Sequence, residues 1–450
     1  MTVIPLHIET SRAGPVRKRV AIIGSGISGM SAAWALAKTH DVAIYEAEAR
    51  PGGHTATVDI DYDGTPIAVD TGFIVYNELN YPNLTALFAH LGVKTHASNM
   101  SFSMSLDDGK LEWSGASYAS LFAQKRNLVS LPFLHMLKEI MRFNRICVED
   151  RDSGVTAGKT IGHYLSFRKF APRFRDDYLI PMGAAIWSTP RVKMLDFPAD
   201  AFISFFENHR LIHNERPDWR TVSGGSRTYL TRLMQEIPDS VRTSRAVTSV
   251  HRSAHQVFVT DVTGATEAYD HAVIACHSDQ ALRILTDATQ LEKSTLSAIA
   301  YRPNRVVLHR DASLMPKRKQ AWAAWNYLRT SRPEGEPEVS TTYWMNRLQG
   351  IDEKMPLFIT LNPPREPKSG TVFGQWSFDH PQFDRQALTA QKTLAGIQGL
   401  GNVRFAGAWT GYGFHEDGLR SGLEAAQGLG ADLPFPIAGS KIVRALEAAE

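Results

Sequence analysis

The residues with the clearest chemical purpose form a glycine motif close to the N-terminus. The apolar run 20–23 predicts a buried parallel strand, and the six residues after it have G-x-G-x-x-G spacing. These six residues are Gly24, Ser25, Gly26, Ile27, Ser28 and Gly29. Glycines at this spacing let a backbone turn approach a pyrophosphate, whose charge the N-terminus of the following helix stabilises. The next expected strand, 42–45, precedes Glu46, where an acid binds ribose hydroxyls, so the pattern predicts a bound dinucleotide.

A second glycine-containing loop follows this acid. Residues 46–54 read E-A-E-A-R-P-G-G-H, and the glycine pair predicts a second backbone segment that closes over the pyrophosphate. A basic side chain beside the pair would neutralise phosphate charge. The residues that we assign to this loop are Ala47, Arg50, Gly52, Gly53 and His54. A plain Pro-Gly turn is the alternative, and the position directly after a dinucleotide-binding unit favours the first interpretation.

The pattern E-A-x-x-R-x-G-G at residues 46–53 is similar to the extension of the dinucleotide-binding fold in flavin amine oxidases, phytoene-type desaturases and protoporphyrinogen oxidase. This resemblance implies FAD as a permanently held cofactor. The superfamily usually has arginine where this chain has His54, so phosphate neutralisation would fall more on Arg50 and the backbone. Within the superfamily, the chain most resembles a bacterial group of FAD-dependent oxidoreductases associated with cyclopropane-synthase-like lipid methyltransferases. The likeness covers nearly the whole chain, including D-T-G-F at 70–73 and G-Y-G-F-H-E-D-G-L at 411–419.

The resemblance also assigns residues to the other parts of the cofactor. Gly72 and Phe73 would pass the flavin ring, and the backbone of Val247 would contact the adenine. Gly407 lies in an F-A-G motif, after which the superfamily has an acid that holds the ribityl chain. This sequence has Ala408 at that position, which puts the usual ribityl contact in doubt.

A last helix is expected near Gly418. Its N-terminal amides, including that of Leu419, would face flavin N1 and O2 and stabilise negative charge on the reduced flavin. His415, Glu416 and Asp417 would lie beside the ring, where they are candidates for proton transfer and, for Asp417, for cofactor binding. Capping of a helix is the alternative for the two acids.

Trp187 is a further candidate for the substrate side. It ends the apolar run 180–187, which is composed of small and aliphatic residues and suits the lining of a substrate cavity. Burial in the core explains the same residues equally well, so both interpretations stay open.

Composition excludes several classes of protein. The 450 residues are 43% hydrophobic and 21% charged, which is typical of a globular protein of about two or three domains. A net charge of +3 gives no argument for nucleic acid. The two cysteines form no disulfide framework or metal-binding pattern and suit a reducing cytoplasm. Because no apolar run reaches the length of a signal peptide or of a membrane span, we expect a cytoplasmic protein.

The motifs divide the chain into segments of two kinds. We expect an α/β fold with a discontinuous, Rossmann-like FAD-binding domain and an α+β substrate domain that contains a mixed or antiparallel sheet and helices. The FAD-binding segments are expected at 17–77, 221–297 and 396–437, and the substrate segments at 78–220 and 298–395. Further elements are expected as a helix over 82–91 and strands over 306–309, 340–344 and 358–362. Nothing in the sequence specifies an oligomeric state.

A basic amphipathic helix is expected over residues 132–148. Its apolar stripe would contain Phe133, Leu137, Ile140 and Met141, and its basic face His135, Lys138, Arg142 and Arg145. Such a helix can lie on an anionic membrane, which would put the protein at the inner face of the membrane. A helix of the substrate domain with a solvated basic face is the alternative.

Three functions are compatible with these patterns. The first is a flavoenzyme that oxidises or desaturates an apolar, acyl-lipid-like substrate by hydride transfer, which the aromatic second domain and the lipid-methylating association favour. The second is an amine oxidase that yields an imine and hydrogen peroxide. Amine oxidases resemble one another in a lysine near flavin N5, whereas residues 294–316 contain none and Arg305 is the nearest basic candidate. The third is a non-catalytic FAD-bearing module, which the many flavin-side motifs disfavour.

Overall fold

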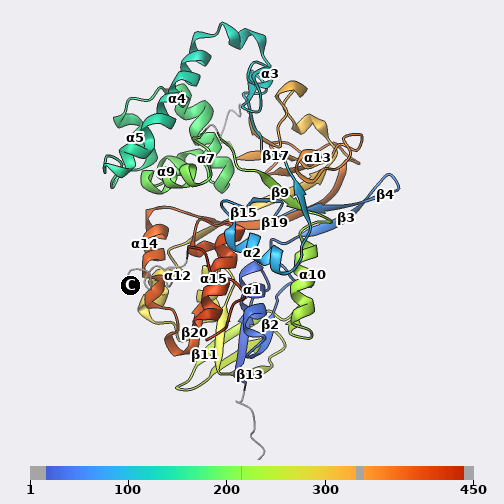
Figure 1. Ribbon diagram of the computed structural model, residues 1–450, viewed down its shortest axis with the longest axis vertical. Coiled ribbons are helices and arrows are strands. Elements are labelled where there is room, and N and C mark those ends of the chain that lie inside the picture. Colours follow the sequence, from blue (N-terminus) through green and yellow to red (C-terminus); the bar gives the residue numbers. More distant parts are fainter. Residues whose placement is uncertain (1–16, 214, 331–338, 440–450) are drawn as a thin grey trace, which may run out of the picture.

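A parallel sheet forms the first half of the molecule. The computed structural model describes residues 17–213, 215–330 and 339–439, and Figure 1 shows their arrangement. Five parallel strands are ordered β10-β2-β1-β14-β20. Their bounds are β1 (Arg19–Ile23), β2 (Asp41–Tyr45), β10 (Val241–Arg242), β14 (His271–Ile274) and β20 (Val403–Phe405). Three distant segments of the chain thus supply one sheet, and the predicted α/β class is confirmed.

Side chains on the two faces of this sheet enter two separate cores, because successive residues of a strand point in opposite directions. Val20 and Ile22 of β1 pack with four helices, whereas Ala21 and Ile23 pack on the other face. The helices on the first face are α1 (Ile27–Leu36), α2 (Pro82–His90), α10 (Arg227–Glu236) and α15 (His415–Gln427). The second face is covered by α11 (Ser278–Ile284), α12 (Gln290–Leu296), α14 (Arg385–Thr393) and a small antiparallel sheet. Its strands are β11 (Val247–Arg252), β12 (Val257–Asp261) and β13 (Thr266–Tyr269).

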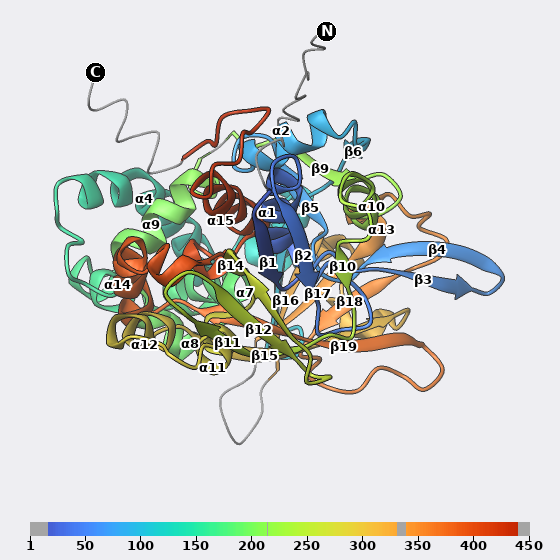
Figure 2. The same cartoon turned by 90° about the horizontal axis from the view of Figure 1, so that it is seen from below.

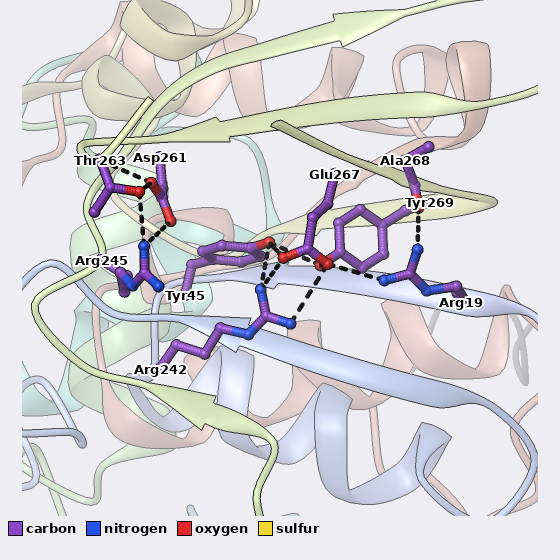
Figure 3. A network of polar contacts seen from close by, with 9 residues as sticks. All are labelled: Arg19, Tyr45, Arg242, Arg245, Asp261, Thr263, Glu267, Ala268 and Tyr269. Carbon is purple, nitrogen blue, oxygen red and sulfur yellow. Dashed lines mark hydrogen bonds and ion pairs between the residues drawn. The ribbon is translucent and has the colours of Figure 1, made fainter. Parts of the chain in front are cut away.

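A polar network ties the small antiparallel sheet to the parallel one (Figure 3). Glu267 on β13 accepts hydrogen bonds from Arg242 on β10 and from Arg19 on β1, the latter at 2.9 Å. The hydroxyl groups of Tyr45 and Tyr269 lie 2.7 Å apart beside the carboxylate. The hydrogen bond from Arg242 lowers the pKa of Glu267 to about 2. The carboxylate therefore connects three strands while it is ionised.

A seven-stranded sheet forms the second half, in the order β19-β15-β18-β17-β16-β7-β8. Its pairs are antiparallel except β16 with β7, which joins residues near 104 to residues near 327. The strands are β7 (Phe102–Leu106), β8 (Leu111–Ser114), β15 (Ala300–His309), β16 (Trp325–Arg329), β17 (Ser340–Trp344), β18 (Phe358–Leu361) and β19 (Val372–Gln382), with α13 (Met345–Gln349) after β17. The long strands β15 and β19 cross the middle of the molecule, between the parallel sheet and a cap of helices (Figure 1).

Two smaller sheets connect the halves. The hairpin of β3 (Thr57–Tyr62) and β4 (Thr65–Asp70) turns at Asp63-Gly64, where Gly64 has φ +90°, and projects from the side of the molecule (Figure 2). A three-stranded sheet contains β5 (Val75–Asn77), β9 (Trp219–Val222) and β6 (Thr95–Ala97). This sheet brings the chain back from the cap to the parallel sheet.

The cap is a group of helices with an aromatic core. Its members are α3 (Tyr118–Leu121), α4 (Leu131–Asp152), α5 (Ile161–Phe167), α6 (Pro172–Phe174), a π-helical turn (Arg175–Leu179), α7 (Ile180–Trp187), α8 (Arg191–Leu195) and α9 (Ala199–Asn208). Phe143, Phe174 and Phe202 are among its fully buried side chains. Aromatic rings at these positions give a small cap a large buried apolar area.

The basic helix agrees with its prediction in part. Phe133 is buried and Leu137 and Ile140 pack partly buried against the same core, as expected. The inward stripe also contains Met136 and Phe143, whereas Met141 is two-thirds exposed. Arg142 lies over the ring of Phe170 and donates to the carbonyl of Arg168 at 2.7 Å, so it belongs to the packing of the cap. The apolar stripe of α4 therefore packs mainly inside the cap and does not face a membrane. Among the described residues, no helix is both long and apolar enough to cross a bilayer.

The domain boundaries stay predictions, and the packing adds detail to them. Helix α2 packs into the core of α1 and α15 although it follows residue 77, and α14 packs into the core on the other face of the parallel sheet although it precedes residue 396. Both helices are joined to that sheet by burial of their apolar sides. Sequence patterns locate the helices but do not reveal which core receives them.

We expect Glu267→Gln to destabilise the protein by about 1 kcal/mol at about pH 7, after allowance for partial exposure of the carboxylate. Because the folded pKa lies below the unfolded value of 4.5, the stabilisation is present above that value and fades as the pH falls toward 2. Urea unfolding at about pH 7 and about pH 3 measures this, and the difference in stability between the two proteins should be smaller at the lower pH. Glu366→Gln, in an exposed pair with Arg305, is the matched control and should change stability little. An equal loss from both substitutions would contradict the assigned role of the network.

Candidate functional site

The glycine turn after β1 is built as the motif requires. Gly24 has φ +101°, and a Cβ there would lie 2.9 Å from the carbonyl oxygen of Ala275 on the neighbouring strand. A Cβ at Gly29 would lie 1.9 Å from the carbonyl oxygen of Gly24. Both positions therefore need glycine for close packing. Gly26 differs, because nothing lies within 4 Å of the Cβ that it lacks.

The open position at Gly26 suits a pyrophosphate. Gly26 begins α1 with no side chain capping the helix, so the first amides of α1 have no side-chain partner there. Gly53 closes over the same place, since its missing Cβ would lie 3.2 Å from the Cα of Gly26. Free helix amides, open space and two converging glycine backbones are what a dinucleotide phosphate needs. The residues that are present therefore fit the expected cofactor, and the six motif residues lie together as predicted.

Ser25 joins the two glycine loops. Its N–H donates to Glu46 Oε2 at 3.0 Å, its hydroxyl donates to the same oxygen, and it accepts from the N–H of Gly52 at 3.0 Å. Glu46 Oε1 accepts only from the N–H of Glu48 among the described residues, so it keeps a lone pair for a ribose hydroxyl. The segment before Val247, whose contact with the adenine stays a prediction, runs close by, because the N–H of Arg245 donates to the carbonyl of Glu46 at 2.8 Å. Ala47 is exposed directly after the acid.

Arg50 holds the loop that carries the glycine pair. Its guanidinium donates to the carbonyl oxygens of Pro51, Gly53 and Thr55, the last two at 2.8 and 2.9 Å. Its share in neutralising phosphate charge, together with the backbone amides and the N-terminus of α1, stays a prediction.

The last helix packs directly on the first. A Cβ at Gly418 would lie 2.8 Å from a side-chain carbon of Ile27, and one at Gly422 would lie 2.1 Å from the carbonyl oxygen of Ser28. The N-terminal ends of α1 and α15 thus lie side by side. The amide of Gly418 already donates to the carbonyl of Phe414, so the contact of Leu419 with the flavin stays a prediction.

Glu416 and Asp417 are capping acids, which was the alternative interpretation. Glu416 accepts from the backbone amides of Asn83 and Leu84 at 2.9 and 3.0 Å and so caps α2, not its own helix. Asp417 accepts from the amides of Tyr412 and Phe414 and from Arg420. Burial raises the pKa of both carboxyls, and these donors oppose that rise. Proton transfer is therefore withdrawn for Glu416, because its acceptor positions are used in the fold.

His415 remains beside the expected ring position. It stacks on Phe73 with ring centroids 4.0 Å apart, and its Nε2 lies 2.6 Å from the hydroxyl of Tyr229. Burial lowers the pKa of His415 to about 3, so the imidazole is neutral. Phe73 is held by its N–H, which donates to the carbonyl of His54 at 2.8 Å, and Gly72 passes so closely that a Cβ would lie 2.2 Å from the same oxygen.

Two further histidines lie near His54, and no sequence pattern predicted them. His380, on β19, has its ring centroid 5.7 Å from that of His54, and its Nδ1 lies 3.0 Å from the hydroxyl of Ser188. His277 stacks on Tyr301 of β15 at 4.3 Å. Burial, with smaller contributions from neighbouring histidines, lowers the pKa of His54 to about 3 and that of His380 to about 4. Only the pairing of β15 with β19 brings these residues together, so spacing along the chain could not reveal them.

His54, His380 and His415 are half-buried, and the rings of His54 and His380 lie beside each other. No group of three or more metal-ligating side chains lies close enough to hold an ion in the described part of the chain.

Trp187 belongs to the aromatic core of the cap. Its ring stacks on Phe197 at 4.7 Å and lies 4.5 Å from Phe205. Phe205 in turn stacks on Phe414, one residue before His415, at 5.1 Å. The core interpretation is therefore favoured, and Trp187 is connected to Phe414 through the ring of Phe205.

Gly407 holds the turn before α15. Its amide donates to the hydroxyl of Ser421 at 2.9 Å, and a Cβ there would lie 2.3 Å from the indole nitrogen of Trp409. The turn continues as Ala408–Thr410, so no carboxylate stands directly after Gly407. The departure seen in the sequence is thus a real absence of the acid at this turn.

We expect Gly26→Val to lose FAD without unfolding. The backbone of Gly26 has φ −61° and ψ 176°, which valine can adopt, and its side chain would fill the open position over α1. Flavin absorbance per protein after purification should fall to near zero while circular dichroism and the unfolding midpoint of the apoprotein stay unchanged. Gly115→Val, at an exposed glycine without positive φ, controls for adding the side chain and should keep its flavin. Normal flavin content in Gly26→Val would refute this placement of the pyrophosphate.

Comparisons with known proteins agree with this arrangement. Over 48 residues, 10% of this chain and 9% of the relative, the chain is 52% identical to an L-amino acid oxidase from Cerastes cerastes. A putrescine oxidase bound to putrescine shares the fold with a TM-score of 0.64 and 16% identity, covering 93% of this chain and 100% of that one. A fatty acid isomerase from P. acnes has a TM-score of 0.64 and 14% identity over 92% and 99% of the two chains.

A cyclohexylamine oxidase from Brevibacterium oxydans is similar at a TM-score of 0.62 and 16% identity, over 92% of this chain and 99% of that one. At such identities these structures establish the fold, and the family follows from the sequence. Residues 27–310 match the family of flavin containing amine oxidoreductases, a range that begins inside the first glycine loop and includes the second glycine loop and the return to the parallel sheet. The chain therefore belongs to the flavin-containing amine oxidoreductase family and is an FAD-dependent oxidoreductase.

Proposed function

We propose that this enzyme oxidises or desaturates an apolar substrate that carries an acyl chain, such as an acyl lipid. The observation that carries the proposal is a group of uncharged histidines beside the expected position of the flavin. Burial holds the pKa values of His54, His380 and His415 well below neutrality, so all three are uncharged at neutral pH. Glu416 and Asp417, the acids nearest to His415 along the chain, are used as caps. Uncharged side chains suit an uncharged carbon chain better than an ammonium group.

The resident cofactor would supply the electron acceptor: bound FAD takes two electrons from the substrate as a hydride. The residues that would hold it are those of the two glycine loops, Glu46 and the N-terminal ends of α1 and α15. The protein must accept the proton that leaves with the hydride. His380 is suited to this because it is neutral, and Ser188, in the left-handed conformation at φ 49°, fixes its ring through Nδ1. We assign His380 as the proton acceptor and His415 as a neutral ring that packs against the flavin.

The aromatic cap supports an apolar substrate. Its core reaches the flavin side through Phe205, which contacts both Tyr412 and Phe414. The neighbours of the same fold include oxidases of amines and an isomerase of fatty acids, so the scaffold accommodates both classes. The resemblance to a bacterial group of oxidoreductases that is associated with lipid methyltransferases also supports a lipid substrate.

Amine oxidation is the second candidate, and membership of the family favours it. Against it, β15 and its flanking residues 294–316 contain no lysine. Arg305 is engaged at the surface, where its guanidinium donates to Glu366 at 2.6 Å and 2.8 Å. It is thus no substitute for a lysine beside the flavin.

Anaerobic reduction of the bound flavin separates these candidates. The yellow holoenzyme is mixed without oxygen with phospholipids and free fatty acids in one arm, and with putrescine, cyclohexylamine and L-amino acids in the other. We expect bleaching of the flavin by the acyl compounds alone. Only in these compounds can the reacting carbon lie away from a charged group, whereas in the amines and amino acids it carries the ammonium group. Without oxygen, only the reduction of the flavin by the substrate is measured, and the result does not depend on which acceptor later reoxidises the flavin. Bleaching by an amine, with an imine as product, would replace the proposal by the second candidate.

We expect His380→Ala to slow flavin reduction by about 10²–10⁴-fold with unchanged flavin content, as for loss of a general base. Because only the neutral imidazole accepts a proton, the wild-type rate should fall as the pH drops toward about 4, where His380 becomes protonated. That limb of the pH profile should be absent from the variant. His163→Ala, at an exposed histidine of α5, is the control. A slowed variant that retains the wild-type pH profile would assign His380 a structural role only.

A further inference from the structure

Exposed apolar side chains gather at one end of the molecule. Within residues 117–138, which we call the apical segment, the exposed large apolar residues are Tyr118, Leu128, Val129, Leu131 and Leu134. Tyr118, Val129 and Leu131 are 87%, 81% and 79% exposed. Figure 1 shows α3 and the start of α4 at one end of the longest axis, opposite to β13. Scattered exposed apolar residues are ordinary, but this concentration in a short segment marks an interaction site.

The exposed side chains are not a consequence of a disordered fold. The turn of α3 is held by Ser117 and Ser120, which cap each other reciprocally. Phe133 and Met136 anchor the start of α4 in the core of the cap. The apical segment is therefore anchored in the core of the cap by its inward side chains. Its outward apolar side chains are exposed and do not contribute to that core.

The charge of the segment has one sign. Residues 113–138 contain Lys125, Arg126 and Lys138 and neither aspartate nor glutamate. Lys125 and Lys138 are exposed, and neither has an ion-pair partner in the ranges that the structure covers. The apical segment thus combines exposed aliphatic and tyrosyl side chains with unpaired cations. Such a segment is complementary to a surface with negative headgroups above an apolar interior.

We propose that the apical segment docks the enzyme onto an anionic lipid bilayer. Val129 and Leu131 would enter the boundary between headgroups and acyl chains, and Lys125 and Lys138 would contact lipid phosphates. The surface differs from the long face of α4, whose apolar stripe is buried, and involves only the end of that helix. The docking proposal holds for either substrate class, because it depends on the surface of the cap and not on the flavin site. A protein partner with an acidic, apolar face is the competing occupant, and the test distinguishes it.

Flotation with vesicles tests the docking with the complete holoenzyme. Vesicles of phosphatidylcholine alone are compared with vesicles that also contain phosphatidylglycerol. We expect binding to the anionic vesicles only and weaker binding as salt is raised. No binding to either vesicle would overturn the proposal and leave a protein as the occupant. Equal binding to both would overturn the role of the cations.

Variants locate the contact. Val129→Asp with Leu131→Asp should abolish flotation, and Lys125→Gln and Lys138→Gln should each weaken it by about fivefold. Val372→Asp, at an exposed apolar residue on the distant edge strand β19, is the matched control and should float like wild type. Unchanged flavin absorbance in every variant shows that the fold is kept. Flotation of the Val129/Leu131 variant at the wild-type level would refute the assignment.

Discussion

The cofactor site depends on how closely α1 and α15 approach each other. Gly422 lies against the backbone of Ser28 and Gly418 against Ile27, so neither position has room for a Cβ. Only with glycine can two helix N-termini lie side by side, each with unpaired amides and a partial positive charge. One end lies where the pyrophosphate is expected and the other where the flavin is expected. A larger residue would separate them and divide the site into two unrelated halves.

Local patterns predicted the parts of the site that local geometry builds. The strand, glycine turn and helix at 19–36 and the acid Glu46 are formed by residues close in sequence. The partners of Glu416 could not be predicted in this way, because they are Asn83 and Leu84, more than three hundred residues earlier. A carboxylate at the start of one helix looks the same in sequence whether it caps that helix or another.

The same reason explains the histidines and the basic helix. His54 and His380 meet because β19 pairs along β15 and reaches back to the second glycine loop. In the stripe of α4 only Met141 was wrong, because the packing of the cap buries Met136 and Phe143 and leaves Met141 exposed. Periodicity identifies that a helix is amphipathic, but the neighbours that it meets decide which residues are buried.

The order of the parallel sheet has a consequence for how the protein is made. Its strands β1, β14 and β20 are neighbours, yet they begin at residues 19, 271 and 403. A ribosome must therefore deliver some four hundred residues before the last strand and α15 can join the first helix. During that time the glycine turn exists without its partner helix, and the cap, whose helices are consecutive in the chain, can form earlier. The expected flavin site is thus completed late in the synthesis and folding of this enzyme.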